Sequence, residues 1–352
     1  MLNNLRIEKL IKNLPENVNC ALITSNINRK YFTGMKSSAG VLAVFRDGAY
    51  LFIDFRYIEK ARKMVKSAEV IEITRYYEQL KDLLKSHKAE TVAVESREMT
   101  LFALSTYKER LPKVKFLSDN TLSDLITDMR QVKDAEEITK IELAQEIAED
   151  AFHRILKFIK VGMSERQIAL ELDNLMLESG SEGVSFDTIV LTGANTSMPH
   201  GVPNKDSFAE KNDLILMDFG AVVDGYHSDM TRTICLGNMT EEQKFIYSLV
   251  LETQKTALKA VKSGVKGKIP DKIARDFMGE YNVNFRHSLG HGVGLEIHEE
   301  PNLSENSDSV LSPGNIVTVE PGIYLPGKFG VRIEDFVAVT EYGCRNLTKA
   351  PK

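Results

Sequence analysis

The sequence predicts an α/β N-terminal domain followed by an α+β domain that carries the chemistry. The chain has 352 residues, a length typical of two domains. Short strand-like and helix-like stretches alternate over residues 1–125, whereas long helices and antiparallel hairpins dominate residues 131–352. With 43% hydrophobic and 27% charged residues, the composition excludes a disordered, collagen-like or low-complexity protein.

Turn and strand signals define the elements of the N-terminal domain. Two apolar stretches, 40–45 and 49–54, flank Asp47-Gly48, which predicts a hairpin. Further strands are expected at 20–25, 68–74 and 91–95, and helices at 55–66, 76–86 and 100–110.

Capping boxes mark three long helices of the second domain. In this motif a Ser, Thr or Asp side chain and a Glu or Gln side chain three residues on each accept the other's backbone N–H. The pairs are Asp134 with Glu137, Ser164 with Gln167 and Thr240 with Gln243. The first helix is expected to run to about residue 160, the second to end before Gly180, and the third to run to about residue 262. Strands are expected at 187–192, 214–223, 226–236, 315–320 and 331–340.

The charge distribution narrows the classes of partner. The net charge is -5, with +6 over residues 1–130 and -11 over residues 131–352. Most of these acidic groups are expected to form a solvated surface, and the second half is where cations could collect. The opening residues show no basic segment followed by an apolar stretch of about 7–15 residues, and no apolar run elsewhere approaches about 20 residues. We therefore expect a cytoplasmic protein that binds neither nucleic acid nor a membrane.

Asp218 interrupts an apolar strand, where an ionised carboxylate is costly unless a cation meets it. A two-residue turn at Asp224-Gly225 would pair Asp218 with Thr231. Asp229 is then the diagonal neighbour of Asp218 on the same face. Two adjacent carboxylates repel each other, and divalent cations between them would remove that penalty.

A second carboxylate pair is expected near the C-terminus. Glu320 ends one apolar strand and Glu334 lies in another. If residues 326–330 form a five-residue loop, Glu334 lies opposite Gly322 and diagonal to Glu320, on one face of the hairpin. This second pair is built in the same way as the first.

Five of the seven histidines lie between residues 200 and 298, three of them in the glycine-rich segment 287–301. They are His200, His227, His287, His291 and His298. The segment is not a helical H-E-x-x-H zinc motif, because Asn302 stands where the second histidine would be needed. We expect His227 to be structural.

Four carboxylates and an imidazole form a hard, oxygen-rich ligand set. Such a set suits two bridged divalent cations, and Mn²⁺, Co²⁺, Fe²⁺ and Zn²⁺ are all chemically possible. Two such cations can activate a water molecule and polarise a carbonyl group. Hydrolysis of an amide is the reaction class that these residues favour.

The ordered set of ligand types resembles the dinuclear metallo-aminopeptidases of the pita-bread fold. It consists of Asp218, Asp229, His291, Glu320 and Glu334. The flanking motifs resemble the branch of Xaa-Pro aminopeptidase and Xaa-Pro dipeptidase (prolidase). They are MPHG (198–201), MDFG (217–220), SDMTRT (228–233) and LEIHEEP (295–301). The resemblance implies a pita-bread catalytic domain over residues 131–352 and, more loosely, a creatinase-like α/β domain over residues 1–125.

The resemblance also implies roles for the metal-binding residues. The five ligands would hold two divalent cations, Mn²⁺ being the expected metal. Asp229 and either Glu320 or Glu334 are the candidates to bridge them. Glu320 would also act as the proton shuttle for the attacking water.

Histidines and an arginine complete the implied site. His287 and His298 would donate hydrogen bonds to the scissile carbonyl or its oxyanion, and His200 would position the substrate. We expect Arg332 to contact a ligand carboxylate, because it lies two residues before Glu334. Members of the family commonly form dimers, so a homodimer is expected.

The implied substrate is a peptide with proline at the second position, cleaved before the proline. A dipeptidase must also hold a free carboxylate, usually with Arg or Lys. The segment after His291 carries Leu295, Glu299 and Glu300 but no cation. The cation would then come from the N-terminal domain of this or a second subunit, with Arg29 and Arg56 as candidates.

The sequence therefore favours an Xaa-Pro aminopeptidase, with the dipeptidase as the alternative. A non-catalytic peptide-binding module of the same fold is the alternative from a different class. Such modules usually lose ligands, and this chain has lost none.

Overall fold

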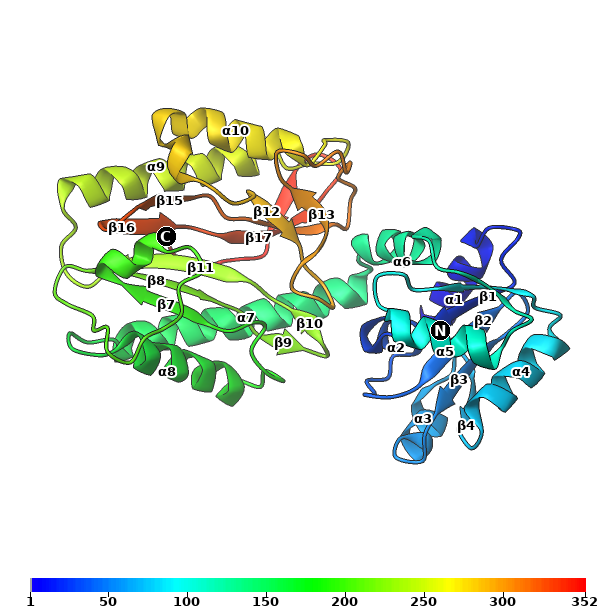
Figure 1. Ribbon diagram of the computed structural model, residues 1–352. Coiled ribbons are helices and arrows are strands. Elements are labelled where there is room, and N and C mark those ends of the chain that lie inside the picture. The colour runs from blue at the N-terminus through cyan, green and yellow to red at the C-terminus, as the bar shows by residue number, and fades with distance from the viewer. Residues whose placement is uncertain (1) are drawn as a thin grey trace. The chain divides into compact units, whose positions relative to one another are not determined.

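The computed structural model describes residues 2–352. The chain divides into two compact units, Met1–Met129 and Arg130–Lys352. We describe each unit by itself (Figure 1).

The first unit is built on a mixed sheet of order β4-β3-β2-β1-β5-β6. Its strands are β1 (Cys20–Ile23), β2 (Val41–Phe45), β3 (Ala49–Ile53), β4 (Glu69–Glu72), β5 (Thr91–Val94) and β6 (Lys115–Leu117). β2 pairs antiparallel with β1 and β3, whereas β4, β5 and β6 join through parallel ladders. The predicted hairpin at Asp47-Gly48 is confirmed, with Val44 paired to Ala49.

The helices of this unit were predicted in part. They are α1 (Leu2–Asn13), α2 (Asn26–Thr33), α3 (Ile58–Met64), α4 (Tyr76–Ser86), α5 (Leu101–Arg110) and α6 (Thr121–Gln131), the last of which continues into the second unit. The sequence predicted α3, α4 and α5 but missed α1, α2 and α6. At eight residues α2 is too short to show a helical period, although Ser25 caps its start and Gly34 ends it in the left-handed conformation.

The second unit contains two larger sheets, of order β11-β8-β7 and β13-β12-β14-β17-β18, and the short ladders β9–β10 and β15–β16. The strands of the first half are β7 (Ile189–Thr192), β8 (Leu214–Phe219), β9 (Val222–Val223), β10 (Tyr226–His227) and β11 (Met230–Cys235). Those of the second half are β12 (Gly290–Gly292), β13 (Glu299–Leu303), β14 (Ile316–Val319), β15 (Gly322–Leu325), β16 (Phe329–Arg332), β17 (Asp335–Val339) and β18 (Cys344–Asn346).

The capping boxes correctly predicted the long helices of this unit. Its helices are α7 (Ala135–Phe158), α8 (Glu165–Glu178), α9 (Glu241–Leu258) and α10 (Lys268–Met278), with 3₁₀ turns η1 (Gly193–Ser197) and η2 (Gly279–Asn284). All three predicted boxes form both of their hydrogen bonds. The sequence missed α10, whose start at Gly267 has no side-chain cap.

Helices cover the outer side of each half of the second unit. Figure 1 shows α7 and α8 along the β7–β8–β11 sheet, and α9 and α10 beside the other sheet. One apolar core joins Phe152 and Leu172 to Met217, and another joins Val250 and Ala274 to strands near the C-terminus. Because the helices bury the outer faces, the inner faces of both sheets are left to form a site.

The register of the second carboxylate hairpin differs from the prediction. Gly322 pairs with Arg332, not with Glu334, because the chain reverses within Pro326–Lys328. The turn is tight because Gly327 adopts a φ of 72° and the Lys328 N–H bonds to the Leu325 carbonyl. The predicted five-residue loop was therefore too long by two residues.

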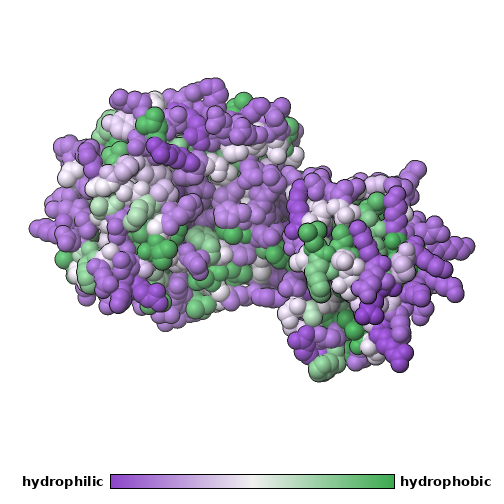
Figure 2. Space-filling model, viewed as in Figure 1, coloured by the Kyte–Doolittle hydropathy of each residue, from purple (hydrophilic) through white to green (hydrophobic). Residues whose placement is uncertain are grey.

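The visible surfaces in Figure 2 are mostly hydrophilic, with small hydrophobic patches between hydrophilic side chains. Within residues 2–352, every helix is too short or too polar to cross a membrane.

Arg232 of β11 anchors the last residues of the chain beneath the inner face. Its side chain is 1% exposed and forms an ion pair with buried Asp335 at 3.0 Å. The same guanidinium donates to the backbone carbonyls of Glu334 and Ala350. Arg232 therefore holds the backbone next to Glu334 as well as the terminal segment.

Replacing this arginine tests the anchor. Arg232→Met should lower the free energy of unfolding by about 3–5 kcal/mol, because it leaves a buried carboxylate poorly compensated. Arg345→Met removes an exposed ion pair with Glu142 and should cost at most about 1 kcal/mol. Urea unfolding monitored by circular dichroism measures both. Equal losses in the two variants would contradict the assignment of Arg232 as the anchor.

Candidate active site

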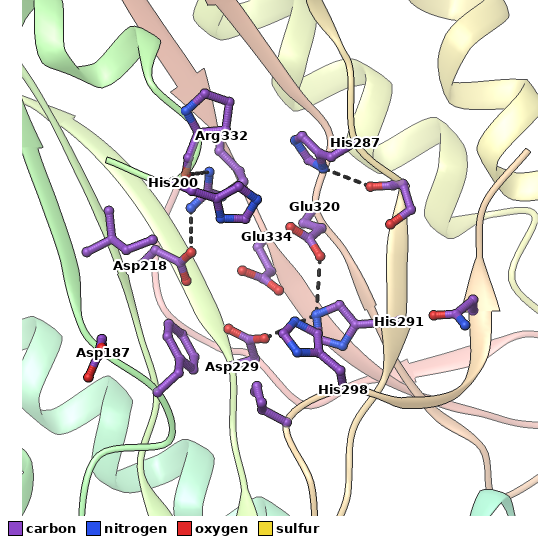
Figure 3. A pocket seen from close by; sticks show the side chains of 16 residues that line it. Asp187, His200, Asp218, Asp229, His287, His291, His298, Glu320, Arg332 and Glu334 are labelled. Carbon is purple, nitrogen blue, oxygen red and sulfur yellow. Dashed lines mark hydrogen bonds and ion pairs between the residues drawn. The ribbon is translucent and has the colours of Figure 1, made fainter. Parts of the chain in front are cut away.

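The β8–β11 hairpin brings Asp218 and Asp229 together. Thr231 pairs with Asp218, in agreement with the predicted register, and Asp229 lies diagonal to Asp218. The backbones approach so closely at the strand bend that a Cβ on Gly220 would lie 1.9 Å from the Ser228 carbonyl oxygen. Both aspartates point into one cavity (Figure 3).

The second hairpin places Glu320 directly opposite Glu334. Val319 pairs with Asp335 on one side of them, and the Ile333 N–H bonds to the Pro321 carbonyl on the other. Side chains alternate between faces with a period of two, so a register error of two residues leaves each side chain on its predicted face. The two glutamates therefore share a face as expected, although they are directly opposite and not diagonal.

His291 lies between the two carboxylate pairs. Its Nε2 is 3.5 Å from Asp229 Oδ2 and 3.4 Å from Glu320 Oε1. Its Nδ1 is 3.1 Å from the Gly292 carbonyl oxygen, which can only accept, so the proton sits on Nδ1. Nε2 thus presents a lone pair to the carboxylates. Ligand atoms of Asp229, His291 and Glu334 all lie within 4.8 Å of one another.

Arg332 is the cation that the structure places against these acids. Its guanidinium donates a hydrogen bond to Asp218 Oδ2. From the sequence we expected Arg332 to contact one of these carboxylates. It also donates to the Tyr324 hydroxyl and to the Thr231 hydroxyl, both at 3.0 Å. Arg332 is 3% exposed and is therefore held in one place by buried partners.

Burial and mutual repulsion disfavour ionisation of the carboxylates. Burial, together with the charges of Glu334, Asp218 and Glu320, raises the pKa of Asp229 well above its ordinary value. Burial and the charges of Glu320 and Asp218 raise the pKa of Glu334 in the same way. Burial raises the pKa of Glu320 to about 8, even though Arg332 opposes the shift. The single positive charge of Arg332 therefore cannot neutralise all four carboxyl groups if they are ionised.

The same residues fit divalent cations. Asp218 Oδ1 and Glu334 Oε1 are buried and have no hydrogen-bond partner within residues 2–352. Buried carboxylate oxygens without a donor are costly, and a cation would satisfy both. Burial lowers the pKa of His291 to about 4, so its ring is neutral near pH 7 and able to bind a metal.

The three other predicted histidines line the cavity, which has a volume of about 590 Å³. His298 lies beside His291, with ring centroids 4.4 Å apart, and His200 enters from the loop after η1 (Figure 3). Both ring nitrogens of His287 have protein partners. Nδ1 donates to the Ser288 carbonyl at 2.8 Å, and Nε2 lies 2.9 Å from the Tyr324 hydroxyl.

Sequence reasoning missed three hydroxyl groups around the carboxylates. Thr231 donates to Glu334 Oε2 at 2.7 Å, and Thr318 donates to Glu320 Oε1 at 3.1 Å. Tyr324 lies between Arg332 and His287. The predicted register already placed Thr231 opposite Asp218, so the proximity of Thr231 to the carboxylates could have been inferred from the sequence.

The candidate carboxylate-binding arginines of the first unit are both engaged. Arg29 is 1% exposed and donates to the Thr24 and Ser37 carbonyls, so it supports the fold and is not available to a substrate. Arg56 is exposed and pairs with Asp54 at 2.6 Å.

Comparison with known families decides the classification. The model of metallopeptidase family M24 matches residues 139–341, more than half of the chain. The chain belongs to metallopeptidase family M24. A second model, the creatinase/prolidase N-terminal domain, matches residues 6–132. The predicted fold class is thus confirmed, with a pita-bread catalytic domain and a creatinase-like N-terminal domain, and this M24 protein is an enzyme.

Individual relatives of this M24 peptidase are similar over nearly its whole length. A Xaa-Pro dipeptidase of Pyrococcus furiosus is 38% identical over 99% of this chain and 98% of its own. The solved structure of a Xaa-Pro dipeptidase from Bacillus anthracis has a TM-score of 0.95 at 37% identity, covering 99% of this chain and 98% of that one. The X-Pro aminopeptidase from Thermotoga maritima has a TM-score of 0.92 at 38% identity, covering 98% of both. The resemblance inferred from the sequence is therefore confirmed.

The raised pKa values predict that cation binding releases protons. At about pH 7 the metal-free site should hold a proton on Glu320, and an added divalent cation should displace it. Near pH 9 the release should be smaller, because Glu320 is then already ionised. Calorimetry in two buffers with different ionisation enthalpies measures the number of protons released. Cation binding near pH 7 without proton release would contradict the raised pKa values.

Proposed function

We propose that this M24 peptidase is a dinuclear metal-dependent exopeptidase that cleaves the bond between an N-terminal residue and proline. The observation that carries the proposal is the convergence of two carboxylate pairs around the lone pair of His291. Two buried carboxylate oxygens without hydrogen-bond donors support it. The family and the names of its relatives support the Xaa-Pro specificity.

The proposed metal ligands are the five side chains that the sequence singled out. They are Asp218, Asp229, His291, Glu320 and Glu334. Asp229 and either glutamate are proposed to bridge the two cations. Mn²⁺ is the proposed metal, and the hard ligand set also suits Co²⁺, Fe²⁺ and Zn²⁺. When bound, the two cations would supply Lewis acidity and lower the pKa of a water molecule.

The protein's own groups would then manage protons and orientation. Glu320 is proposed to take the proton of the attacking water, since its Oε1 faces the cavity beside His291. His298 and His200 are exposed in the cavity and are proposed to donate hydrogen bonds to the scissile carbonyl or to hold the substrate. Arg332 fixes the orientation of Asp218.

For His287 we propose a positioning role. Because Nδ1 donates to the Ser288 carbonyl, Nε2 accepts the proton of the Tyr324 hydroxyl. That hydroxyl in turn accepts from Arg332. His287 therefore orients the chain of hydrogen bonds that ends at Asp218, and in this arrangement it has no nitrogen left to donate to a substrate.

We propose that the enzyme accepts peptides longer than two residues and is thus an aminopeptidase. Among the described residues that line the cavity, the only Lys or Arg is Arg332, which is already bound to Asp218. A dipeptidase needs a further cation for the free carboxylate. The dipeptidase remains the second candidate because several relatives carry that name.

Assembly and location complete the proposal. We propose a homodimer located in the cytoplasm, and sedimentation velocity at two protein concentrations tests the dimer. A single monomeric species at both concentrations would contradict it.

Removal of metal should abolish hydrolysis of an Xaa-Pro peptide, and added Mn²⁺ or Co²⁺ should restore it. His291→Ala and Asp229→Ala should each lower kcat/KM by at least about 10³-fold, since each removes a proposed ligand. His153→Ala changes an exposed histidine of α7 and should stay within twofold of the parent.

Peptide release measured by chromatography, with metal content from elemental analysis, provides the readout. Full activity in excess chelator would refute the dinuclear mechanism. A non-catalytic binding module would show no turnover with any metal.

Peptide length should separate the two exopeptidase activities. For one N-terminal residue, kcat/KM on Xaa-Pro-Yaa-Zaa should equal or exceed that on Xaa-Pro, because the described cavity offers no spare cation for a free carboxylate. A tenfold preference for the dipeptide, worth about 1.4 kcal/mol of transition-state binding, would instead show a dipeptidase. Equal cleavage of Xaa-Ala peptides would overturn the proline preference.

A further inference from the structure

A buried group of charges lies directly behind His298. Glu299 follows His298 in the chain, and its side chain is 6% exposed. It forms ion pairs with Arg130 and, at 3.1 Å, with Lys133, whose side chain is 1% exposed. We call Glu299, Arg130 and Lys133 the Glu299 cluster. Its cations come from the end of α6 and from the segment between α6 and α7, far from Glu299 in sequence.

The Glu299 carboxylate also closes the loop that precedes it. It accepts the backbone N–H of Glu296 at 3.0 Å. The Gly294 N–H bonds to the Glu296 carbonyl, and the Gly294 carbonyl accepts the N–H of His227. A Cβ on Gly294 would lie 2.6 Å from Glu299 Oε2, so the carboxylate packs against bare backbone at this point. The loop 293–299 is therefore folded around one charged group.

This loop forms one wall of the cavity. Its residues Ile297 and His298 line the cavity, and the His298 ring packs against that of His291. In Figure 3 His298 reaches toward the carboxylates from this loop. The imidazole of His298 has no hydrogen-bond partner within residues 2–352, so its position rests on its backbone and on the contact with His291.

Stability alone does not account for the Glu299 cluster. A buried ion pair is a weak source of stability, because apolar side chains of similar volume often do as well. What an ion pair adds is a single geometry, since each charge must meet its partner. Here the ion pairs fix the position of Glu299, which follows the proposed catalytic residue His298 in the chain.

We propose that Glu299, held by Arg130 and Lys133, is a positioning residue that fixes the loop 293–299 and thereby the ring of His298 in the active-site cavity. The predicted effect of Glu299 on the rate of peptide hydrolysis rests on the proposed function. Its predicted effect on the loop 293–299 does not.

The first test measures the loop in metal-free protein by hydrogen–deuterium exchange. Glu299→Gln should speed exchange at the amides of Gly294 and Glu296 by at least tenfold. The matched control is Glu296→Gln, which removes the more exposed ion-pair partner of Arg130. This control should change exchange by less than twofold. Unchanged exchange in a folded Glu299→Gln protein would overturn the proposal, whatever the enzyme's substrate.

The second test is kinetic. Glu299→Gln should lower kcat on an Xaa-Pro peptide at least tenfold with KM changed less than threefold, while two metal ions remain bound. Loss of metal together with activity would instead show a structural role. If the wild-type protein cleaves no Xaa-Pro peptide with any metal, the proposed function fails, and the exchange result still decides the present proposal.

A double variant covers the case in which Glu299→Gln does not fold, because the single change leaves Lys133 buried without its counter-charge. Glu299→Gln with Lys133→Met removes the charges of Glu299 and Lys133, while Arg130 keeps its ion pair with Glu296, so this variant should fold. If the cluster positions His298, this variant keeps the low kcat and the fast exchange. A folded double variant with wild-type kcat and exchange would show that the cluster only balances charge, and would overturn the proposal.

Discussion

The burial of several carboxylates close together is the constraint on which the second unit depends. Asp218, Asp229, Glu320 and Glu334 meet on the inner faces of two hairpins. Among the described residues that line their cavity, Arg332 is the only Lys or Arg. In such surroundings carboxylates hold protons or require cations. Burial and neighbouring charges raise the pKa of Asp229 and Glu334, which favours the first outcome, and the unpartnered oxygens of Asp218 and Glu334 favour the second.

The rest of the unit holds these acids in place. Hydroxyl groups of Thr231 and Thr318 each donate to one glutamate, so that neither carboxylate can rotate freely. Arg332 spans the two hairpins, since it binds Asp218 on one and the Tyr324 hydroxyl on the other. Beneath them Arg232 fixes the backbone at Glu334. The cavity is therefore preorganised by contacts that are local to each hairpin and by two arginines that join the hairpins.

Sequence reasoning succeeded where a feature depends on near neighbours in the chain. Capping boxes such as Asp134 with Glu137 gave the starts of the long helices, and the Asp224-Gly225 turn gave the Asp218–Thr231 register. The second hairpin was misjudged by two residues because Pro326 and Gly327 allow several loop lengths. Its glutamates stayed on the predicted face only because side chains alternate with a period of two.

Other features depend on packing that the sequence does not display. From the sequence, Tyr324 is an ordinary strand residue. Only the fold shows that its hydroxyl contacts His287 and Arg332. From the sequence, Arg29 could bind a substrate carboxylate. In the fold it is buried and donates to backbone carbonyls. The metal-ligand types could be proposed early because their order along the chain resembles a family pattern. The residues that orient them have no such order and required the structure.

Anomalous X-ray diffraction from crystals soaked in Mn²⁺ tests most directly whether the buried acids hold two cations. Two anomalous peaks are expected in the cavity. Asp218 Oδ1, Glu334 Oε1 and His291 Nε2 should each lie within bonding distance of a peak. No peak, or peaks with Asp218 and His291 outside bonding distance, would contradict the claim that these buried acids exist to hold two cations.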